Sequence, residues 1–287
     1  MTLAKSVATY SSLVRLSHTI FALPFALSSV LLASAYAPIT ARKVALIVLC
    51  IAAARTAAMA FNRLVDRDVD AQNPRTVDRE LPRGVLSVGA VRTLVVASCA
   101  VFVAGAALLS PLCLYLSPIA LGLALGYSYT KRFTALCHVL LGFAVAFAPG
   151  GAWIAMGAQL TLAPWLLVIG VASWVAGFDV LYSLQDQGFD RGAGLHSLPV
   201  RLGTLGALVV SALLHVVTVG CLAGVGLLLG RGLPYFAGVA VVTLLLGYEH
   251  AIVRPSDLSR VNKAFFDLNG YVSLAFFACV ALDRLLS

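Results

Sequence analysis

Acidic residues are scarce in this chain: only 12 of its 287 residues are Asp or Glu, and charged residues of both signs make up 11%. Soluble domains carry roughly 25% charged residues, so this composition excludes a soluble globular protein. The 61% of hydrophobic residues and the mean hydropathy of +0.97 indicate an integral membrane protein. The six cysteines stand singly in apolar stretches, and no pair has a metal-ligand or redox spacing. We interpret them as small residues of the membrane core.

Long apolar segments define the fold class, because a membrane helix needs about 20 mostly apolar residues to cross the hydrocarbon layer. The nine segments that fit lie near residues 19–36, 43–61, 90–109, 112–128, 136–157, 163–182, 205–229, 232–250 and 266–284. The sequence therefore predicts an all-α integral membrane protein, a nine-helix bundle forming a single domain over residues 1–287. Asp66 and Asp186 each end an even-numbered span, and this weak internal repeat predicts two related halves of about 1–130 and 131–287.

Positive charges are distributed unequally between the two sides of the predicted bundle. Fifteen of the twenty Lys and Arg residues fall on the side of the amino terminus, which also carries the connections after spans 2, 4, 6 and 8. The positive-inside rule places this side in the cytoplasm and the protein in a bacterial inner membrane. The net charge of +8 is thus a topology signal with some attraction for anionic lipid or an anionic substrate, and it requires no nucleic acid.

Eight of the twelve acidic residues fall in two short stretches, residues 61–80 and 179–190, each at the end of an apolar span. On a helix with 100° per residue, Asn62, Asp66 and Asp70 lie at about 0°, 40° and 80°, whereas Asp68 points away. The residues of the second stretch that fall within about 80° of one another are Asp179, Tyr182, Asp186 and Asp190. The pattern predicts two acidic stripes, one on each of two helices.

Carboxylates about 6 Å apart along a helix repel one another unless a cation lies between them. Oxygen ligands without His or Cys nearby suit Mg²⁺ or Mn²⁺. Basic residues lie next to the expected site at Arg75, Lys131 and Arg132. Carboxylates, a divalent metal and cations together are what a diphosphate group requires. Arg55 is an intramembrane cation, and we expect it either to pair with a carboxylate of a neighbouring helix or to contact substrate.

Four segments together resemble the UbiA superfamily of intramembrane aromatic prenyltransferases. The first aspartate motif of that family is similar to Asn62-xxx-Asp66-xxx-Asp70 with its continuation to Gly84, and the second to residues 179–190 with their continuation to Gly203. Residues 127–134, which contain the Lys-Arg pair, and residues 18–25 resemble two further segments of the family. The resemblance covers essentially the whole chain.

This resemblance implies a nine-helix bundle with a central cavity open to the bilayer. In it Mg²⁺ would hold a polyprenyl diphosphate, and the polyprenyl group would pass to an aromatic carboxylic acid in ubiquinone or menaquinone biosynthesis. The acceptor would be 4-hydroxybenzoate or a dihydroxynaphthoate, and residues 178–186, 248–250 and 257–262 look closest to the menaquinone branch linked with futalosine. The partners are thus the diphosphate, the aromatic acid and membrane lipid.

The resemblance also implies a role for each polar residue of the two stripes. Lys131 would contact the diphosphate and Arg132 the acceptor's carboxylate, with Arg75 beside them. Asp179 and Tyr182 would position the acceptor or receive its proton, and a hydrogen-bonded structural role is an alternative for both. The residues that would bind the metal and the diphosphate are Asn62 and the catalytic aspartates Asp66, Asp70, Asp186 and Asp190.

Two other classes of protein are alternatives. A polytopic transporter would use Asp179 and Arg55 as pathway residues, but transport gives no reason for two metal-spaced stripes at one membrane face. A magnesium-dependent lipid phosphotransferase would need a DxxDGxxAR pattern, which the sequence does not contain. A prenyltransferase that acts on another acceptor is a third possibility.

Overall fold

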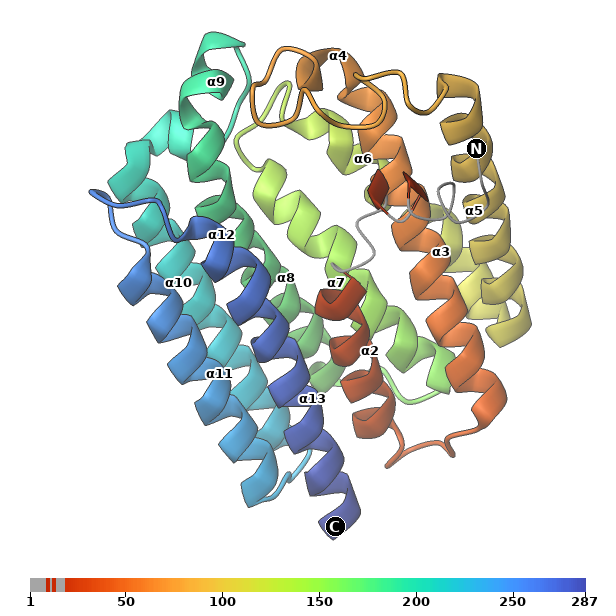
Figure 1. Ribbon diagram of the computed structural model, residues 1–287. Coiled ribbons are helices and arrows are strands. Elements are labelled where there is room, and N and C mark those ends of the chain that lie inside the picture. The colour runs from red at the N-terminus through yellow and green to blue at the C-terminus, as the bar shows by residue number, and fades with distance from the viewer. Residues whose placement is uncertain (1–8, 11, 14–18) are drawn as a thin grey trace. The chain divides into compact units, whose positions relative to one another are not determined.

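The computed structural model describes residues 9–10, 12–13 and 19–287, and within them the chain is helical. His18, at the start of the 18–25 segment, lies outside the described residues. Arg254 and Asp257 form an isolated antiparallel bridge. The long helices are α2 (Thr19–Ala33), α3 (Ala41–Val65), α5 (Val88–Leu109), α6 (Pro111–Thr130), α7 (Cys137–Met156), α8 (Leu162–Ser183), α10 (Leu198–Leu228), α11 (Leu233–Ile252) and α13 (Asn269–Leu286) (Figure 1). The short ones are α4 (Arg67–Asp70), the 3₁₀ turn η2 (Leu184–Asp186), α9 (Gln187–Gly192), α12 (Val261–Lys263) and the π-helical turn η3 (Ala264–Leu268).

Eight helical segments of the described chain are long and apolar enough to cross a membrane, and α2 adds a shorter apolar helix. The predicted all-α membrane class is therefore confirmed, and most helix ends fall within a few residues of the expected ones. The largest difference is at α10, which begins at Leu198 rather than near 205. Ser197 caps this start by accepting a hydrogen bond from the Val200 amide at 3.4 Å. Gly203, with a φ of 71°, then separates a short first turn from the long apolar helix.

The chain divides into two compact units, which we describe separately. Unit 1 contains the described part of residues 1–19 together with residues 45–129. Unit 2 contains residues 20–44 and 130–287. The boundary after Tyr129 is close to the boundary between the predicted halves, but those halves place residues 20–44 in the first half, whereas the structure groups them with unit 2.

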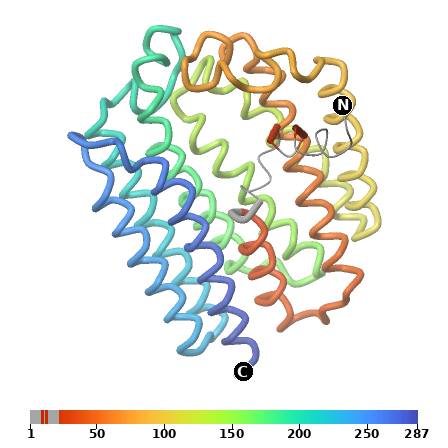
Figure 2. Tube along the Cα trace, in the orientation of Figure 1, coloured from red at the N-terminus to blue at the C-terminus, as the bar shows by residue number. Residues whose placement is uncertain are grey.

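In unit 1, α3 packs closely against α5 and α6. A Cβ atom on Gly105 of α5 would lie 2.7 Å from the Cys50 sulfur of α3, so glycine is needed for this approach. Near the end of α3, the Phe61 ring meets Tyr129 of α6 edge to face, with centroids 5.9 Å apart. Residues 71–87, drawn in orange in Figure 2, connect α4 to α5 through a succession of turns. Leu81 and Leu86 from this connection are buried in the apolar core of unit 1.

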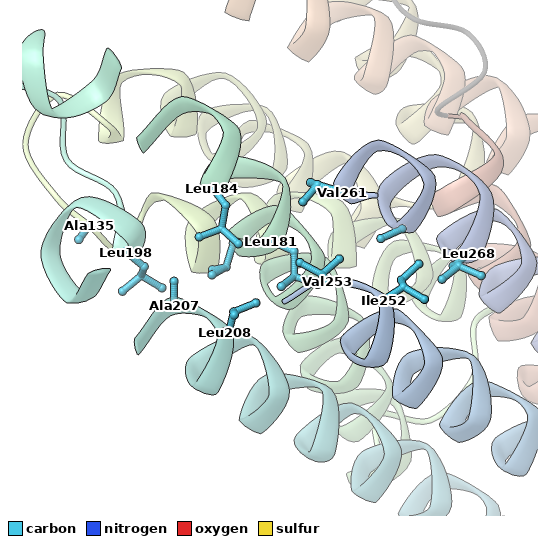
Figure 3. Close-up of a cluster of buried hydrophobic side chains, with 12 residues drawn as sticks. Ala135, Leu181, Leu184, Leu198, Ala207, Leu208, Ile252, Val253, Val261 and Leu268 are labelled. Carbon is cyan, nitrogen blue, oxygen red and sulfur yellow. The ribbon is translucent and has the colours of Figure 1, made fainter. Parts of the chain in front are cut away.

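In unit 2, α8 is the central helix and packs against α7 and α10, while α11 packs against α10 and α13 (Figure 1). Glycines allow the closest approaches: a Cβ on Gly142 of α7 would collide with the Ala172 carbonyl oxygen of α8, and one on Gly177 would collide with the His215 ring of α10. Figure 3 shows the apolar cluster around the end of α8, where Leu181 and Leu184 meet side chains from α10, α11, α12 and η3. The second acidic stretch begins on this buried helix.

Candidate active site

The first acidic stripe lies where α3 ends and α4 begins. Asp66 separates the two helices, with φ −92° and ψ 4°. The i to i−4 hydrogen bonds nevertheless continue, from the Asp66 amide to the Asn62 carbonyl at 2.9 Å and from the Asp70 amide to the Asp66 carbonyl at 2.7 Å. The Asn62 side-chain amide donates to Asp66 Oδ2 at 2.8 Å. The local backbone thus keeps the four-residue spacing on which the predicted stripe depends.

Asp70 is held by the loop that follows it. Both of its carboxylate oxygens accept hydrogen bonds from Arg79 Nη1 at 2.7 Å, and its side chain is almost fully buried. Thr76 Oγ1 donates to the Asp70 carbonyl at 3.1 Å, and the Arg75 amide donates to Asn73 Oδ1 at 2.9 Å. The connection therefore folds back over the acidic stripe and brings Arg79 to it, a contact that sequence spacing did not reveal.

The other charged residues of this stretch lie further out. Asp68 pairs with Arg67 at 2.9 Å and its side chain is 80% exposed, so it points away as expected. Asp78 and Arg75 are exposed as well. The Arg75 side chain therefore lies at the surface of unit 1, although its backbone belongs to the turn that supports Asp70.

The second stripe is not one regular helix. α8 ends at Ser183, the 3₁₀ turn η2 contains Asp186, and α9 contains Asp190. A 3₁₀ helix turns about 120° per residue rather than 100°, so the angles expected for a continuous α-helix do not apply through η2. Both aspartates are buried, and Asp190 is fully so. The cost of burying these charges has to be offset by a cation.

Lys131, in the connection between α6 and α7, supplies such a cation. Its Nζ lies 2.8 Å from Asp190 Oδ1. Burial lowers the pKa of Lys131, but the carboxylates of Asp190 and Asp186 raise it by more, so the pKa lies above its usual value and the ammonium stays charged. Backbone hydrogen bonds hold the segments together, because the His196 amide donates to the Lys131 carbonyl at 2.7 Å and the Leu195 amide to the Asp190 carbonyl at 2.8 Å. The next residue, Arg132, has an exposed side chain.

Asp179 lies about two turns before Asp186 on α8 and has a partner that the sequence reading missed. Its Oδ2 is 2.7 Å from Nδ1 of His138, the second residue of α7. An ionisable residue inside a membrane helix is by default a candidate functional residue, and this rule could have identified His138. Tyr182 is half-buried, and its ring stacks on Phe265 of η3 with centroids 4.0 Å apart.

Arg55 lies in the middle of α3, on the same helix as Asn62. Its guanidinium is mostly buried near Tyr127 of α6, and its Nε has no hydrogen-bond partner among the residues that the structure describes. Of the two expectations for Arg55, pairing with a carboxylate is not seen among the described residues of unit 1. A buried guanidinium nitrogen without a partner is costly in a membrane, so a polar or anionic ligand would stabilise it.

The donor chemistry of both stripes fits a hard divalent cation. No group of three or more His, Cys, Asp or Glu side chains converges into a closed metal cage within the described ranges. Mg²⁺ does not need one, because it is usually bound by one or two carboxylates plus water and phosphate oxygens. The fully buried Asp190 carboxylate pairs with Lys131 and also interacts with the Ser197 side chain. A carboxylate has about four lone-pair sites, so it can accept a second cation as well.

Membrane-length helices, with buried carboxylates paired to Arg or Lys near helix ends in each unit, define a polytopic membrane protein. Residues 22–278 match the UbiA prenyltransferase family, so the chain belongs to this family and is a prenyltransferase. The family resemblance noted from the motifs is thereby confirmed.

Two curated relatives are named 4-hydroxybenzoate octaprenyltransferase. The one from Aromatoleum aromaticum is 30% identical over 229 residues, and the one from Methylobacillus flagellatus is 32% identical over 229 residues. Each alignment covers 80% of this chain and 77% of the relative.

Solved structures of UbiA homologues share the fold. The apo homologue from Aeropyrum pernix K1 has a TM-score of 0.85 and 36% identity, and the match covers 93% of this chain and 98% of that one. A homologue from Archaeoglobus fulgidus bound to DMAPP and Mg²⁺ has a TM-score of 0.73 and 21% identity, over 97% of this chain and 100% of that one. At this lower identity the similarity supports the fold alone.

Proposed function

We propose that this enzyme transfers a polyprenyl group from a polyprenyl diphosphate to an aromatic carboxylic acid in quinone biosynthesis, with Mg²⁺ as cofactor. The observation that carries the proposal is the buried Asp190–Lys131 pair at the end of α8, with its spare capacity for a cation. The names of the curated relatives support 4-hydroxybenzoate as acceptor, and the A. fulgidus homologue binds a prenyl diphosphate with Mg²⁺. A dihydroxynaphthoate is the alternative acceptor, and the sequence of residues 178–186 favours it.

The acidic stripes would hold the metal and, through it, the diphosphate. Bound Mg²⁺ would neutralise the diphosphate and stabilise the negative charge that develops on the leaving group. In unit 2, Lys131 is placed to donate to a diphosphate oxygen without leaving Asp190. In unit 1, Arg79 neutralises Asp70 and can do the same for a phosphate oxygen, since its guanidinium carries several donors. The proposed metal ligands are Asn62, Asp66, Asp70, Asp186 and Asp190.

The acceptor requires a cation for its carboxylate and a group that positions its ring. Arg55 offers a buried guanidinium with an unsatisfied Nε, and Arg132 offers an exposed one after Lys131. Asp179 and Tyr182 lie nearer the middle of the membrane than Asp186 and are both partly accessible. We assign acceptor binding to these side chains. Arg75 is exposed, and we assign to it attraction of the diphosphate at the surface rather than direct contact with the reacting atoms.

The apolar surroundings suit the chemistry. As the allylic C–O bond breaks, the diphosphate leaves with the electron pair and the allyl group becomes electron-deficient, so it would react with water if water were present. The apolar side chains around α8 exclude water, because 72% of the residues in the most apolar stretch of the segment Leu162–Gly192 are buried inside the protein. The ring carbon of the acceptor then forms the new C–C bond.

Product analysis by mass spectrometry tests the proposal. The purified protein is incubated with Mg²⁺, a polyprenyl diphosphate and competing aromatic acids, and we expect one prenylated acid whose formation stops with EDTA and resumes with Mg²⁺. Asp66→Ala and Asp186→Ala should abolish transfer in a folded protein. Asp68→Ala is the matched control, because Asp68 belongs to the same stretch but is exposed. Turnover without any divalent metal would overturn the metal assignment, and solute flux in liposomes by EDTA-treated protein would favour a transporter.

The charge distribution supports an inner-membrane location with the amino terminus and both acidic stretches in the cytoplasm. Alkaline phosphatase fused after residue 287 should be active, because an odd number of spans would put this end in the periplasm. An inactive fusion at this end together with an active fusion in the 253–260 connection would reverse the orientation.

A further inference from the structure

His138 is a buried histidine that links three helices of unit 2. It is the second residue of α7, and only 2% of its surface is exposed. Its Nδ1 lies 2.7 Å from Asp179 Oδ2 on α8. Its Nε2 accepts a hydrogen bond from the backbone amide of Leu198, at the start of α10, with a distance of 3.3 Å. Both ring nitrogens are therefore occupied by groups from other helices.

These two contacts determine which nitrogen carries the proton. A backbone N–H can only donate, so Nε2 of His138 has to be the unprotonated nitrogen. The ring proton is then on Nδ1 and points at the Asp179 carboxylate. The adjacent Cys137 contacts the His196 carbonyl through its sulfur at 3.6 Å, which fixes the same turn of α7. Together these contacts hold the imidazole in one orientation.

The contact with His138 sets the orientation of the Asp179 side chain. The neighbouring residues of α8, such as Phe178 and Val180, are buried and apolar, whereas the Asp179 side chain keeps 23% exposure. The hydrogen bond from His138 fixes Oδ2, so the carboxylate cannot rotate freely. A carboxylate that is fixed at one oxygen and still accessible is suited to receive a proton from a ligand.

We infer that Asp179 receives the ring proton of the aromatic acceptor and that His138 is the positioning residue that aims it, an inference that rests on the proposed function. When the new C–C bond forms, the ring carbon holds both the prenyl group and its hydrogen. The C–H electron pair returns to the ring, the proton passes to the Asp179 carboxylate, and the diphosphate has already taken the electron pair of the C–O bond. No oxidant or further reactant is needed. His138 does not take the proton, because its Nε2 is engaged by the Leu198 amide.

Three variants test the inference in the full-length protein. His138→Gln keeps one donor and one acceptor at the end of the side chain, whereas His138→Leu removes both at similar volume. Asp179→Asn still accepts the hydrogen bond from His138 but cannot take a proton from the acceptor. We expect kcat to fall on the order of 10-fold in His138→Leu and at least 100-fold in Asp179→Asn, and to recover largely in His138→Gln. KM for the polyprenyl diphosphate should stay unchanged.

An acceptor with deuterium on its ring distinguishes a positioning role of His138 from a role in protein stability alone. With the wild-type protein and His138→Gln, deuterium at the substituted carbon should not change the rate if an earlier step is limiting. In His138→Leu the misplaced carboxylate should make proton removal limiting, so the deuterated acid reacts more slowly. Slower turnover without this isotope effect, or with a matching loss of thermal stability, would make His138 structural only.

The variants also distinguish this inference from the proposed function. If the wild-type protein makes the prenylated acid and Asp179→Asn retains its rate, the assignment of the proton acceptor is wrong while the proposed function stands. If the wild-type protein makes no prenylated acid, the proposed function and this inference fail together. Should His138→Leu not fold, Asp179→Asn and His138→Gln still decide the outcome.

Discussion

Removing the Lys131 ammonium leaves the Asp190 carboxylate buried without its cation, and Lys131→Met is the variant that does so at similar side-chain length. Breaking a buried ion pair by removing one partner costs about 3–5 kcal/mol. The Lys131 side chain is 34% exposed while Asp190 is fully buried, so solvent screens part of this cost. We therefore expect a loss of about 2–4 kcal/mol in the free energy of unfolding.

Thermal unfolding of the detergent-solubilised protein measures this loss. For a protein of 150–250 residues, 1 kcal/mol shifts Tm by about 2–4 °C, so Lys131→Met should lower Tm by roughly 5–10 °C. Lys263→Met is the control, because Lys263 is exposed at the same side of unit 2. The double variant with Asp190→Asn no longer buries an unpaired charge, and it should regain most of the lost stability without regaining activity. If the double variant is no more stable than Lys131→Met, the electrostatic reasoning is refuted.

The same pair predicts how the effect depends on pH. The pKa of Lys131 is raised above its usual 10.5 in the folded protein, so the stabilisation is fully present below 10.5 and disappears as the pH rises through the higher folded value. The Tm difference between the wild-type protein and Lys131→Met should therefore be constant between about pH 6 and pH 9. A difference that shrinks within this window would show that Lys131 loses its proton there.

Two further variants probe other parts of the fold. Gly203→Ala should destabilise the protein by about 1–3 kcal/mol, because the φ of 71° with ψ 175° is a conformation that only glycine adopts readily, whereas Gly220→Ala within the regular part of α10 should not lower Tm. Arg79→Met should lower Tm and raise KM for the polyprenyl diphosphate, since it leaves Asp70 buried without its cation, and Arg83→Met, which changes an exposed cation of the same loop, should do neither. Equal effects of Arg79→Met and Arg83→Met in the same assays would contradict the assignment of Arg79.

The fold class and most span positions could be predicted from the sequence, because the thickness of the bilayer sets the length of an apolar helix. The start of α10 could not be predicted in this way, because residues 198–202 form a turn that is too short for its hydropathy to identify it as part of a membrane span. Gly203 ends this turn through a backbone conformation that hydropathy does not encode.

Only those features of the candidate site that depend on residues close together in the sequence could be predicted. The four-residue spacing of Asn62, Asp66 and Asp70 follows from helix geometry, and the structure keeps it. The partners of the carboxylates depend on contacts between segments far apart in the sequence, as for His138 with Asp179, or on the path of a loop, as for Arg79 with Asp70. Periodicity carries no information about such contacts.

The deep burial of α8 also bears on how the protein moves. A helix packed on nearly all sides opens only in large cooperative unfolding events, so its amides should be among the slowest to exchange hydrogen. In the most apolar stretch of α6 only 17% of the residues are buried inside the protein, compared with 72% for the segment Leu162–Gly192 that contains α8, so fewer packing contacts within the protein hold α6 in place. Substrate entry and product release would then proceed by movement of the less buried segments, while α8 keeps the Asp179 side chain in one place throughout the catalytic cycle.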